Sequence, residues 1–241
     1  MKKHIPNTIT CCNLISGCIA TLFASQANNS MALTFIIIGA VFDFFDGFAA
    51  RLLHVSSPVG KELDSLADDI TFGFAPATIV FSMLRATLPA SCGCAWITYV
   101  PYAAFIIAAF SALRLAKFNL DERQTTSFIG LPTPANALFW AALSMTLDSY
   151  GALTATNTTL FAALLVGIVL SSWLLVAEIP MFALKFKSYG WKGNELRFSF
   201  IIISAVLLAI LKWGGFSLII VLYILTSIVS NAFGTKVAKD K

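Results

Sequence analysis

Residues 41–69 read VFDFFDGFAARLLHVSSPVGKELDSLADD, and this stretch places acidic side chains inside an otherwise apolar sequence. Asp43 and Asp46 are three residues apart, and Asp64 and Asp68 are four apart. Either spacing puts two side chains on one face of a helix. If the two helices form a hairpin, four carboxylates face each other. The stretch holds half of the chain's 12 acidic residues, namely Asp43, Asp46, Glu62, Asp64, Asp68 and Asp69.

The composition is that of a membrane protein. Of the 241 residues, 58% are hydrophobic and 12% are charged, and the mean hydropathy is +0.84. Soluble domains carry about 25% charged residues. Eight segments reach or approach the roughly 20 apolar residues that a spanning helix needs. They are 8–27, 31–54, 64–85, 96–118, 133–150, 159–180, 198–212 and 215–233. We therefore expect an all-α integral membrane protein, a polytopic bundle of about eight transmembrane helices.

The basic residues predict the orientation of these helices. With both termini in the cytoplasm, all but two of the 16 Lys and Arg residues fall on the inside, and only Arg85 and Lys212 fall outside. Cytoplasmic loops favour such an excess of positive charge, although six spans would pass the same test. The net charge of +4 then reflects the Lys and Arg residues of the cytoplasmic segments, and no nucleic-acid partner is expected. The N-terminus lacks a clean signal-peptidase site, so we expect a retained first helix.

The acidic stretch then lies at the cytoplasmic membrane surface, where it needs compensation. An ionised Asp inside a membrane segment costs about 2.5–3.5 kcal/mol on insertion scales. Protonation, pairing with Lys or Arg, or bound divalent cations would offset this cost, and Arg51 and Lys61 are too few to neutralise the set. Carboxylate oxygens suit Mg²⁺, Mn²⁺ or Ca²⁺, and two such ions form the clamp used in phosphoryl transfer. The alternative is that these acidic residues form structural ion pairs or lie at a solvated helix end.

Two glycines and an arginine refine this interpretation. Gly47 and Gly60 allow a ligand to approach the backbone closely. The planar guanidinium of Arg51 suits a phosphate. Together with the metals, they suggest a bound diphosphate.

At these residues the chain resembles a known family. Asp46-Gly47-x-x-Ala50-Arg51, eight residues, then Gly60-x-x-x-Asp64-x-x-x-Asp68 is similar to the full signature of the CDP-alcohol phosphotransferases, and Asp43 completes it. Further stretches resemble the phosphatidylserine synthase branch of that family, over about residues 5–190. They are 6–10 with Asn13 and Leu14, 63–68, 72–76, 114–119 and 130–134.

The resemblance implies an enzyme that moves the phosphatidyl group of CDP-diacylglycerol to the hydroxyl of L-serine, giving phosphatidylserine and CMP. It implies two divalent ions, Mg²⁺ or Mn²⁺, held by Asp43, Asp46, Asp64 and Asp68, with Asp68 also the general base. Gly47, Arg51 and Gly60 would lie along the CDP moiety, with Asn13 nearby. The expected setting is the inner membrane of a prokaryote, with the site facing the cytoplasm.

The chain is expected to form a single membrane domain, 1–241. A catalytic core covers about 5–190, and a C-terminal helical hairpin covers about 196–233, where Gly214 and Gly215 allow a tight turn. The hairpin carries no chemically distinctive side chains, so we expect it to support packing or contact in a homodimer.

The sequence identifies the residues that bind the acceptor less specifically than those that bind the metals. Arg114, Lys117 and Arg123 cluster at the cytoplasmic end of the fourth segment, and one of them could bind the serine carboxylate or a lipid phosphate. Their place at a helix end is equally explained by topology. Thr133, Asn136 and Ser127 are candidates for the acceptor pocket, or for bonding to the backbone around Pro132 and Pro134.

Other functions remain open at this stage. Within the same family, the acceptor could be glycerol phosphate, an inositol phosphate or choline. A cation transporter would place acids near the membrane centre and often show repeated halves, and neither is visible here. A structural scaffold would leave the costly acids unexplained.

Overall fold

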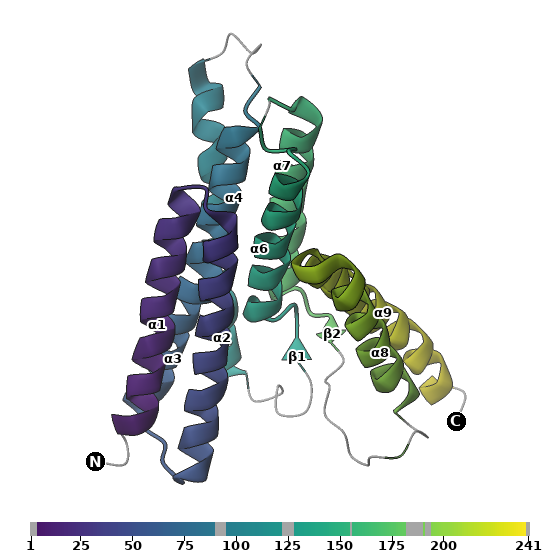
Figure 1. Cartoon of the computed structure of the whole chain (residues 1–241). Helices are drawn as coiled ribbons and strands as arrows, with labels where there is room; N and C mark the ends of the chain where they lie inside the picture. Colours follow the sequence, from purple (N-terminus) through teal and green to yellow (C-terminus); the bar gives the residue numbers. More distant parts are fainter. Residues whose placement is uncertain are drawn as a thin grey trace.

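The protein is a bundle of helices with one two-stranded sheet at its side (Figure 1). The computed structural model describes residues 4–89, 95–121, 128–154, 156–181, 190 and 194–239. In chain order the elements are α1 (His4–Ser25), α2 (Asn29–Leu52), α3 (Pro58–Asp68), η1 (Asp69–Phe74), α4 (Ala75–Ala86), η2 (Ala95–Phe105), α5 (Ile106–Leu120), β1 (Phe128–Ile129), α6 (Thr133–Ser149), α7 (Thr158–Val176), β2 (Pro180–Met181), α8 (Glu195–Leu211), η4 (Lys212–Gly214) and α9 (Gly215–Lys239).

A short turn reverses the chain between α2 and α3. The backbone passes through the left-handed region at His54, where φ is 51°. Ser57 then caps α3, because its hydroxyl accepts a 3.0 Å hydrogen bond from the N–H of Gly60. Pro58 occupies the first helical position, which needs no backbone donor. The turn therefore returns the acids of α3 to the side of α2.

The next helical rod runs without a break from Pro58 to Ala86, but its middle is π-helical. The segment η1 begins directly after Asp68 and ends at Phe74. Gly73 allows a close approach to α5, since a Cβ atom there would lie 2.9 Å from the Cβ of Ser111. Single π turns of this kind are frequent at functional sites.

Three segments meet around one side chain of η1. Thr71 is fully buried between Gly17 of α1 and Gly39 of α2. A Cβ atom at Gly39 would lie 2.5 Å from Cγ2 of Thr71, and one at Gly17 would clash with its Oγ1. The hydroxyl of Thr71 donates a 3.1 Å hydrogen bond to the backbone carbonyl of Asn13. The glycines therefore let α1, α2 and η1 pack in contact.

The apolar core adjoins this junction and contains residues from helices between α1 and α7. Its largest buried side chains include Ile36, Phe72, Ile79 and Trp140. The indole N–H of Trp140 donates to the hydroxyl of Ser171 at 3.2 Å, which ties α6 to α7. Large apolar side chains also point outward on α7 and α8, as a surface facing lipid requires.

The C-terminal hairpin of α8 and α9 is inclined to the rest of the bundle, and α9 packs against α6 (Figure 1). Gly215 is needed in the turn, because a Cβ atom there would lie 2.9 Å from the carbonyl oxygen of Leu207. The hydroxyl of Ser217 donates a 3.0 Å hydrogen bond to the carbonyl of Phe139. The segment η4 (Lys212–Gly214) joins the two helices. The antiparallel pair β1–β2, near the start of α6, was not predicted.

The prediction of an all-α membrane protein is confirmed at the level of class. All eight apolar segments predicted from the sequence contain helix. Within the described residues, five stretches are long and apolar enough to cross a membrane: His4–Ser25, Asn29–Leu52, Trp96–Leu120, Thr158–Val176 and Glu195–Asn231. The last of these runs through α8 and its turn into α9. Helix α6 is shorter, with 17 residues.

Candidate active site

The four aspartates of the sequence motif come together between α2 and α3, in the half of the bundle where the chain turns from α2 into α3. Asp43 and Asp46 come from α2, and Asp64 and Asp68 from α3. One carboxylate oxygen from each of Asp43, Asp64 and Asp68 lies within 4.8 Å of the others. We call these three residues the aspartate triad. The predicted pairing of two acidic helix faces is therefore present.

Helix α1 contributes two hydrogen-bond donors to these carboxylates. The hydroxyl of Thr10 donates to Oδ2 of Asp46 at 2.6 Å. The side-chain amide of Asn13 donates to Oδ1 of Asp68 at 3.0 Å. Short hydrogen bonds to an ionised acceptor are strong, so α1 fixes the orientation of one carboxylate on each acidic helix.

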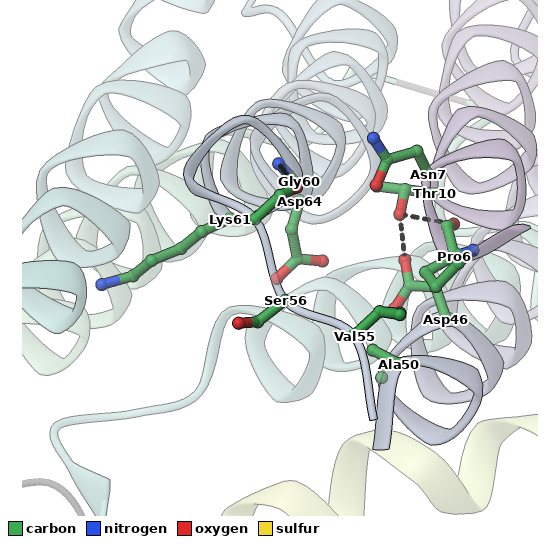
Figure 2. Close-up of a pocket in the computed structure, with 12 residues that line it drawn as sticks. Pro6, Asn7, Thr10, Asp46, Ala50, Val55, Ser56, Gly60, Lys61 and Asp64 are labelled. Atoms are coloured by element: carbon green, nitrogen blue, oxygen red, sulfur yellow. Dashed lines mark hydrogen bonds between the residues drawn. The ribbon is translucent and has the colours of Figure 1, made fainter. Parts of the chain in front are cut away.

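A cavity of about 340 Å³ opens beside Asp46 and Asp64, between the start of α1, the end of α2 and the start of α3 (Figure 2). Gly47 faces open space, with no atom within 4 Å of where its Cβ would be. Gly60 also lines the cavity. The residues that line the cavity are Pro6, Asn7, Thr10, Asp46, Gly47, Ala50, Val55, Ser56, Ser57, Gly60, Lys61 and Asp64.

The triad fits a hard divalent cation. Its donors are carboxylate oxygens, the ligands that Mg²⁺ and Mn²⁺ prefer. Oδ1 of Asp64 is buried and, in the described part of the chain, has no hydrogen-bond partner. A buried acceptor without a partner is costly, and three close carboxylates repel each other. A bound cation would remove both costs.

The other residues expected along the nucleotide are placed differently. Asn13 is fully buried and bonded to Asp68. Arg51 is exposed in the last turn of α2 and does not line the cavity. Their contacts with a CDP moiety stay predictions. Lys61 does line the cavity, while its ammonium donates a 2.8 Å hydrogen bond to the carbonyl of Asn119 at the end of α5.

The two cations of α5 are unlike each other, although they are three residues apart. Arg114 is only 8% exposed, and Lys117 is exposed. The Arg114 guanidinium lies over the ring of Phe118, 5.5 Å from its centroid, and Nη1 is 3.4 Å from the hydroxyl of Thr133. Among the described residues its Nε has no partner. Arg114 also interacts electrostatically with Asp68.

A buried amide lies next to this arginine on α6. Asn136 is one helical turn beyond Thr133 and is fully buried. Neither polar atom of its side chain has a hydrogen-bond partner among the described residues. Buried amides are almost always paired, so Asn136 is a candidate for contact with a polar ligand. Arg123 and Ser127, the remaining acceptor-side candidates, lie outside the described residues.

Sequence reasoning missed two residues near the site. Thr10 could have been found from the period of small and polar residues on the buried face of α1, which includes Thr10, Asn13 and Gly17. Tyr223 of α9 interacts electrostatically with Arg114, although the sequence predicts no chemistry for the hairpin. No local signal marks Tyr223, because only tertiary packing brings α9 to α6.

Comparison with known proteins agrees with this geometry. Residues 3–184 match the model of the CDP-alcohol phosphatidyltransferase family. The chain is 38% identical over 144 residues to a CDP-diacylglycerol–serine O-phosphatidyltransferase of Bacillus subtilis, covering 60% of this chain and 77% of the relative. A protein of the same name from Helicobacter pylori is 30% identical over 230 residues, covering 95% and 91%.

A third relative, also a CDP-diacylglycerol–serine O-phosphatidyltransferase, comes from Mycobacterium leprae. It is 31% identical over 184 residues, which are 73% of this chain and 57% of the relative. The family match covers the aspartate triad, Asp46 and the cavity, and ends before the C-terminal hairpin of α8 and α9 begins. The chain belongs to the CDP-alcohol phosphatidyltransferase family.

Proposed function

We propose that this protein transfers the phosphatidyl group of CDP-diacylglycerol to the hydroxyl of L-serine, giving phosphatidylserine and CMP. The observation that carries the proposal is the aspartate triad beside a cavity lined by Asp46, Gly47 and Gly60. The serine acceptor follows the names of the relatives above. The acids gather in the half of the bundle where the chain turns from α2 into α3, which suits a headgroup reaction better than transport across the membrane.

The reaction needs a donor site, an acceptor site and a base. The serine oxygen bonds to the phosphorus that carries diacylglycerol, and the bond from that phosphorus to the bridging oxygen breaks, so CMP leaves. Asp68 takes the serine proton, as a positioned carboxylate can. Asn13 holds one of its oxygens, which leaves the other to accept the proton.

The four aspartates would hold two divalent ions, Mg²⁺ or Mn²⁺. Bound cations would neutralise the diphosphate and the charge that develops on CMP. The cavity accommodates the CDP moiety, with Gly47 and Gly60 allowing close approach of its diphosphate and Arg51 at the rim. These assignments are supported by the oxygen-rich triad and by the open space at Gly47.

Arg114 is assigned to the serine carboxylate. A cation placed only by membrane topology would be exposed, as Lys117 is, whereas Arg114 is buried. Within the described part of the chain, its Nε and the side-chain amide of Asn136 have no hydrogen-bond partner. They offer the donors and acceptor that a zwitterionic amino acid needs. Lys117 then serves the membrane surface or a lipid phosphate.

The membrane placement follows the charges. We propose eight spans, both termini in the cytoplasm of a prokaryote, the site at the inner face of the inner membrane, and a homodimer. Arg51 is in the last turn of α2 and Lys61 lines the cavity. Arg85 is in the last turn of α4, and α4 ends far from the turn between α2 and α3 (Figure 1). This distribution supports the orientation. Native mass spectrometry of the purified protein measures its oligomeric state.

The decisive experiment measures incorporation of radiolabelled serine into lipid by purified protein, with Mn²⁺ or Mg²⁺ and with chelator. Glycerol phosphate, inositol phosphate and choline are tested as competing acceptors. We expect metal-dependent phosphatidylserine and CMP, and nearly none from Asp68→Asn. Faster transfer to another acceptor would replace serine in the proposal, and full turnover in chelator would refute the metal assignment.

A further inference from the structure

Asp46 is held differently from the other three aspartates. The oxygens of Asp43, Asp64 and Asp68 lie together, but Asp46 is not part of that group. Its Oδ2 accepts the 2.6 Å hydrogen bond from Thr10. One oxygen of Asp46 thus already has a donor from the protein. It lines the cavity, as Asp64 does, whereas Asp43 and Asp68 do not.

Thr10 has one proton and two acceptors within reach. Its Oγ1 lies 2.6 Å from Oδ2 of Asp46 and 3.0 Å from the carbonyl oxygen of Pro6, one turn earlier in α1 (Figure 2). A hydroxyl donates a single hydrogen, and the shorter contact with a carboxylate takes it. The Pro6 carbonyl is the usual partner of a helical Thr. Rotation of one hydroxyl hydrogen would therefore release Asp46 without moving the backbone.

The triad has no comparable supply of donors. Asn13 serves Asp68, while Oδ1 of Asp64 is buried without a partner in the described chain. Positive charge is therefore needed at the triad whether or not a substrate is bound. At Asp46 an added positive charge becomes favourable when the diphosphate brings its own negative charge into the adjoining cavity.

We propose that Thr10 is a positioning residue that withholds Asp46 from metal binding until a nucleoside diphosphate occupies the cavity. The substrate-free protein then binds one divalent ion at the triad. A second ion binds together with the nucleotide, on Asp46 and on Asp64, which belongs to both the triad and the cavity. This ordering rests on the proposed function, because it assumes that the ligand of the cavity is the CDP moiety.

The test counts bound Mn²⁺ by electron paramagnetic resonance on the purified full-length protein, with and without CDP. We expect one tightly bound ion without CDP and two with it. Thr10→Val keeps the side-chain shape and removes the hydroxyl. It should strengthen binding of the second ion without CDP by about tenfold, the worth of one hydrogen bond to a charged group.

Two further variants separate positioning from general damage. Thr10→Ser keeps the hydroxyl and should restore the dependence of the second ion on CDP. Asp46→Asn should keep the first ion and lose the second. Two ions bound to the wild type without CDP, or a second ion that Thr10→Val weakens, would overturn the proposal. Serine transfer by the same preparation tests the proposed function separately: turnover with two ions already bound refutes only the ordering.

Discussion

Asn13 of α1 donates a 3.0 Å hydrogen bond from its side-chain amide to Oδ1 of Asp68 on α3. This bond joins the first helix to the proposed base across 55 positions of sequence. Because Asp68 already belongs to the aspartate triad, Asn13 orients a carboxylate in its metal-binding position, and removing such a partner typically costs 10- to 100-fold in metal affinity or activity. Asn13→Leu should therefore lower turnover by about 10- to 100-fold and move the Mn²⁺ dependence to higher concentration.

Steady-state assays at several Mn²⁺ concentrations check this prediction. At saturating Mn²⁺, the KM for CDP-diacylglycerol should stay close to that of the wild type. A large rise in that KM with unchanged kcat would instead mean that Asn13 contacts the nucleotide, as the family resemblance implies.

Arg114 should control the affinity for serine. Arg114→Lys keeps the charge but removes Nε and the planar fork that suits a carboxylate. We expect the KM for serine to rise by about tenfold or more, the size of one charged hydrogen bond, with the KM for CDP-diacylglycerol little changed. Arg85→Lys makes the same change at the exposed end of α4 and should leave both constants alone. Equal effects of the two variants would contradict the assignment.

The C-terminal hairpin should influence the acceptor through Tyr223. The phenol interacts electrostatically with Arg114, and its ring packs on Phe200 with centroids 6.1 Å apart. Tyr223→Phe keeps the ring and removes the phenol oxygen that interacts with Arg114, so the KM for serine should rise by about three- to tenfold, the range of a single polar interaction. Tyr150→Phe, at a side chain 81% exposed, is the matched control. An unchanged serine KM in Tyr223→Phe would limit the hairpin to packing.

Gly47 should matter for the ligand and not for folding. A methyl group there meets no atom within 4 Å and projects into open space at the cavity. Ala also favours a helix by about 1 kcal/mol over Gly. Gly47→Ala should keep or raise the thermal unfolding temperature while weakening CDP binding, measured by titration calorimetry. Unchanged CDP affinity would show that the cavity is not the nucleotide site, and loss of the fold would contradict the open space at Gly47.

The packing around Thr71 predicts a rescue. Gly39→Ala would place Cβ 2.5 Å from Cγ2 of Thr71, and such overpacking costs about 1–3 kcal/mol. Thr71→Ser removes Cγ2 but keeps the hydroxyl that donates to Asn13. Thermal unfolding should therefore show a loss for Gly39→Ala that Thr71→Ser largely restores.

Gly17→Ala is the control for this rescue. Its Cβ would lie 2.8 Å from the Cα of Thr71, which no change of that side chain can move. Thr71→Ser should therefore not restore it. Restoration of both glycine variants alike would mean that Thr71→Ser stabilises the protein in general, without relieving a particular contact.

The sequence predicts best what depends on composition and local spacing. The helical class and the meeting of the acidic faces follow from apolar length and from the i, i+3 and i, i+4 periods. The start of α3 was expected at residue 64 and lies at Pro58. A search for apolar length passes over this amphipathic turn, although Ser57 and Pro58 are recognisable start signals.

Tertiary packing decides what the sequence leaves open. Arg114 and Lys117 share a helix face by spacing, yet only Arg114 is buried, because neighbouring helices cover one turn of α5 and not the next. The bond between Thr10 and Asp46 spans 36 positions, and the pairing of Tyr223 with Arg114 depends on how α9 meets α6. Long-range contacts of this kind have no local sequence period.

The π-helical segment η1 sets the angular relation between the chemistry of the rod and its packing. A residue added to a helix turns everything beyond it by about 100°, and a π turn holds such an extra residue. The acids of α3 and the buried side of α4 therefore face their separate partners only because Asp69–Phe74 is wound more widely. Deleting one residue from this segment would rotate α3 relative to α4. With α4 still packed in place, the carboxylates would then point away from α2, so the extra residue of this one turn decides whether a reactive centre exists.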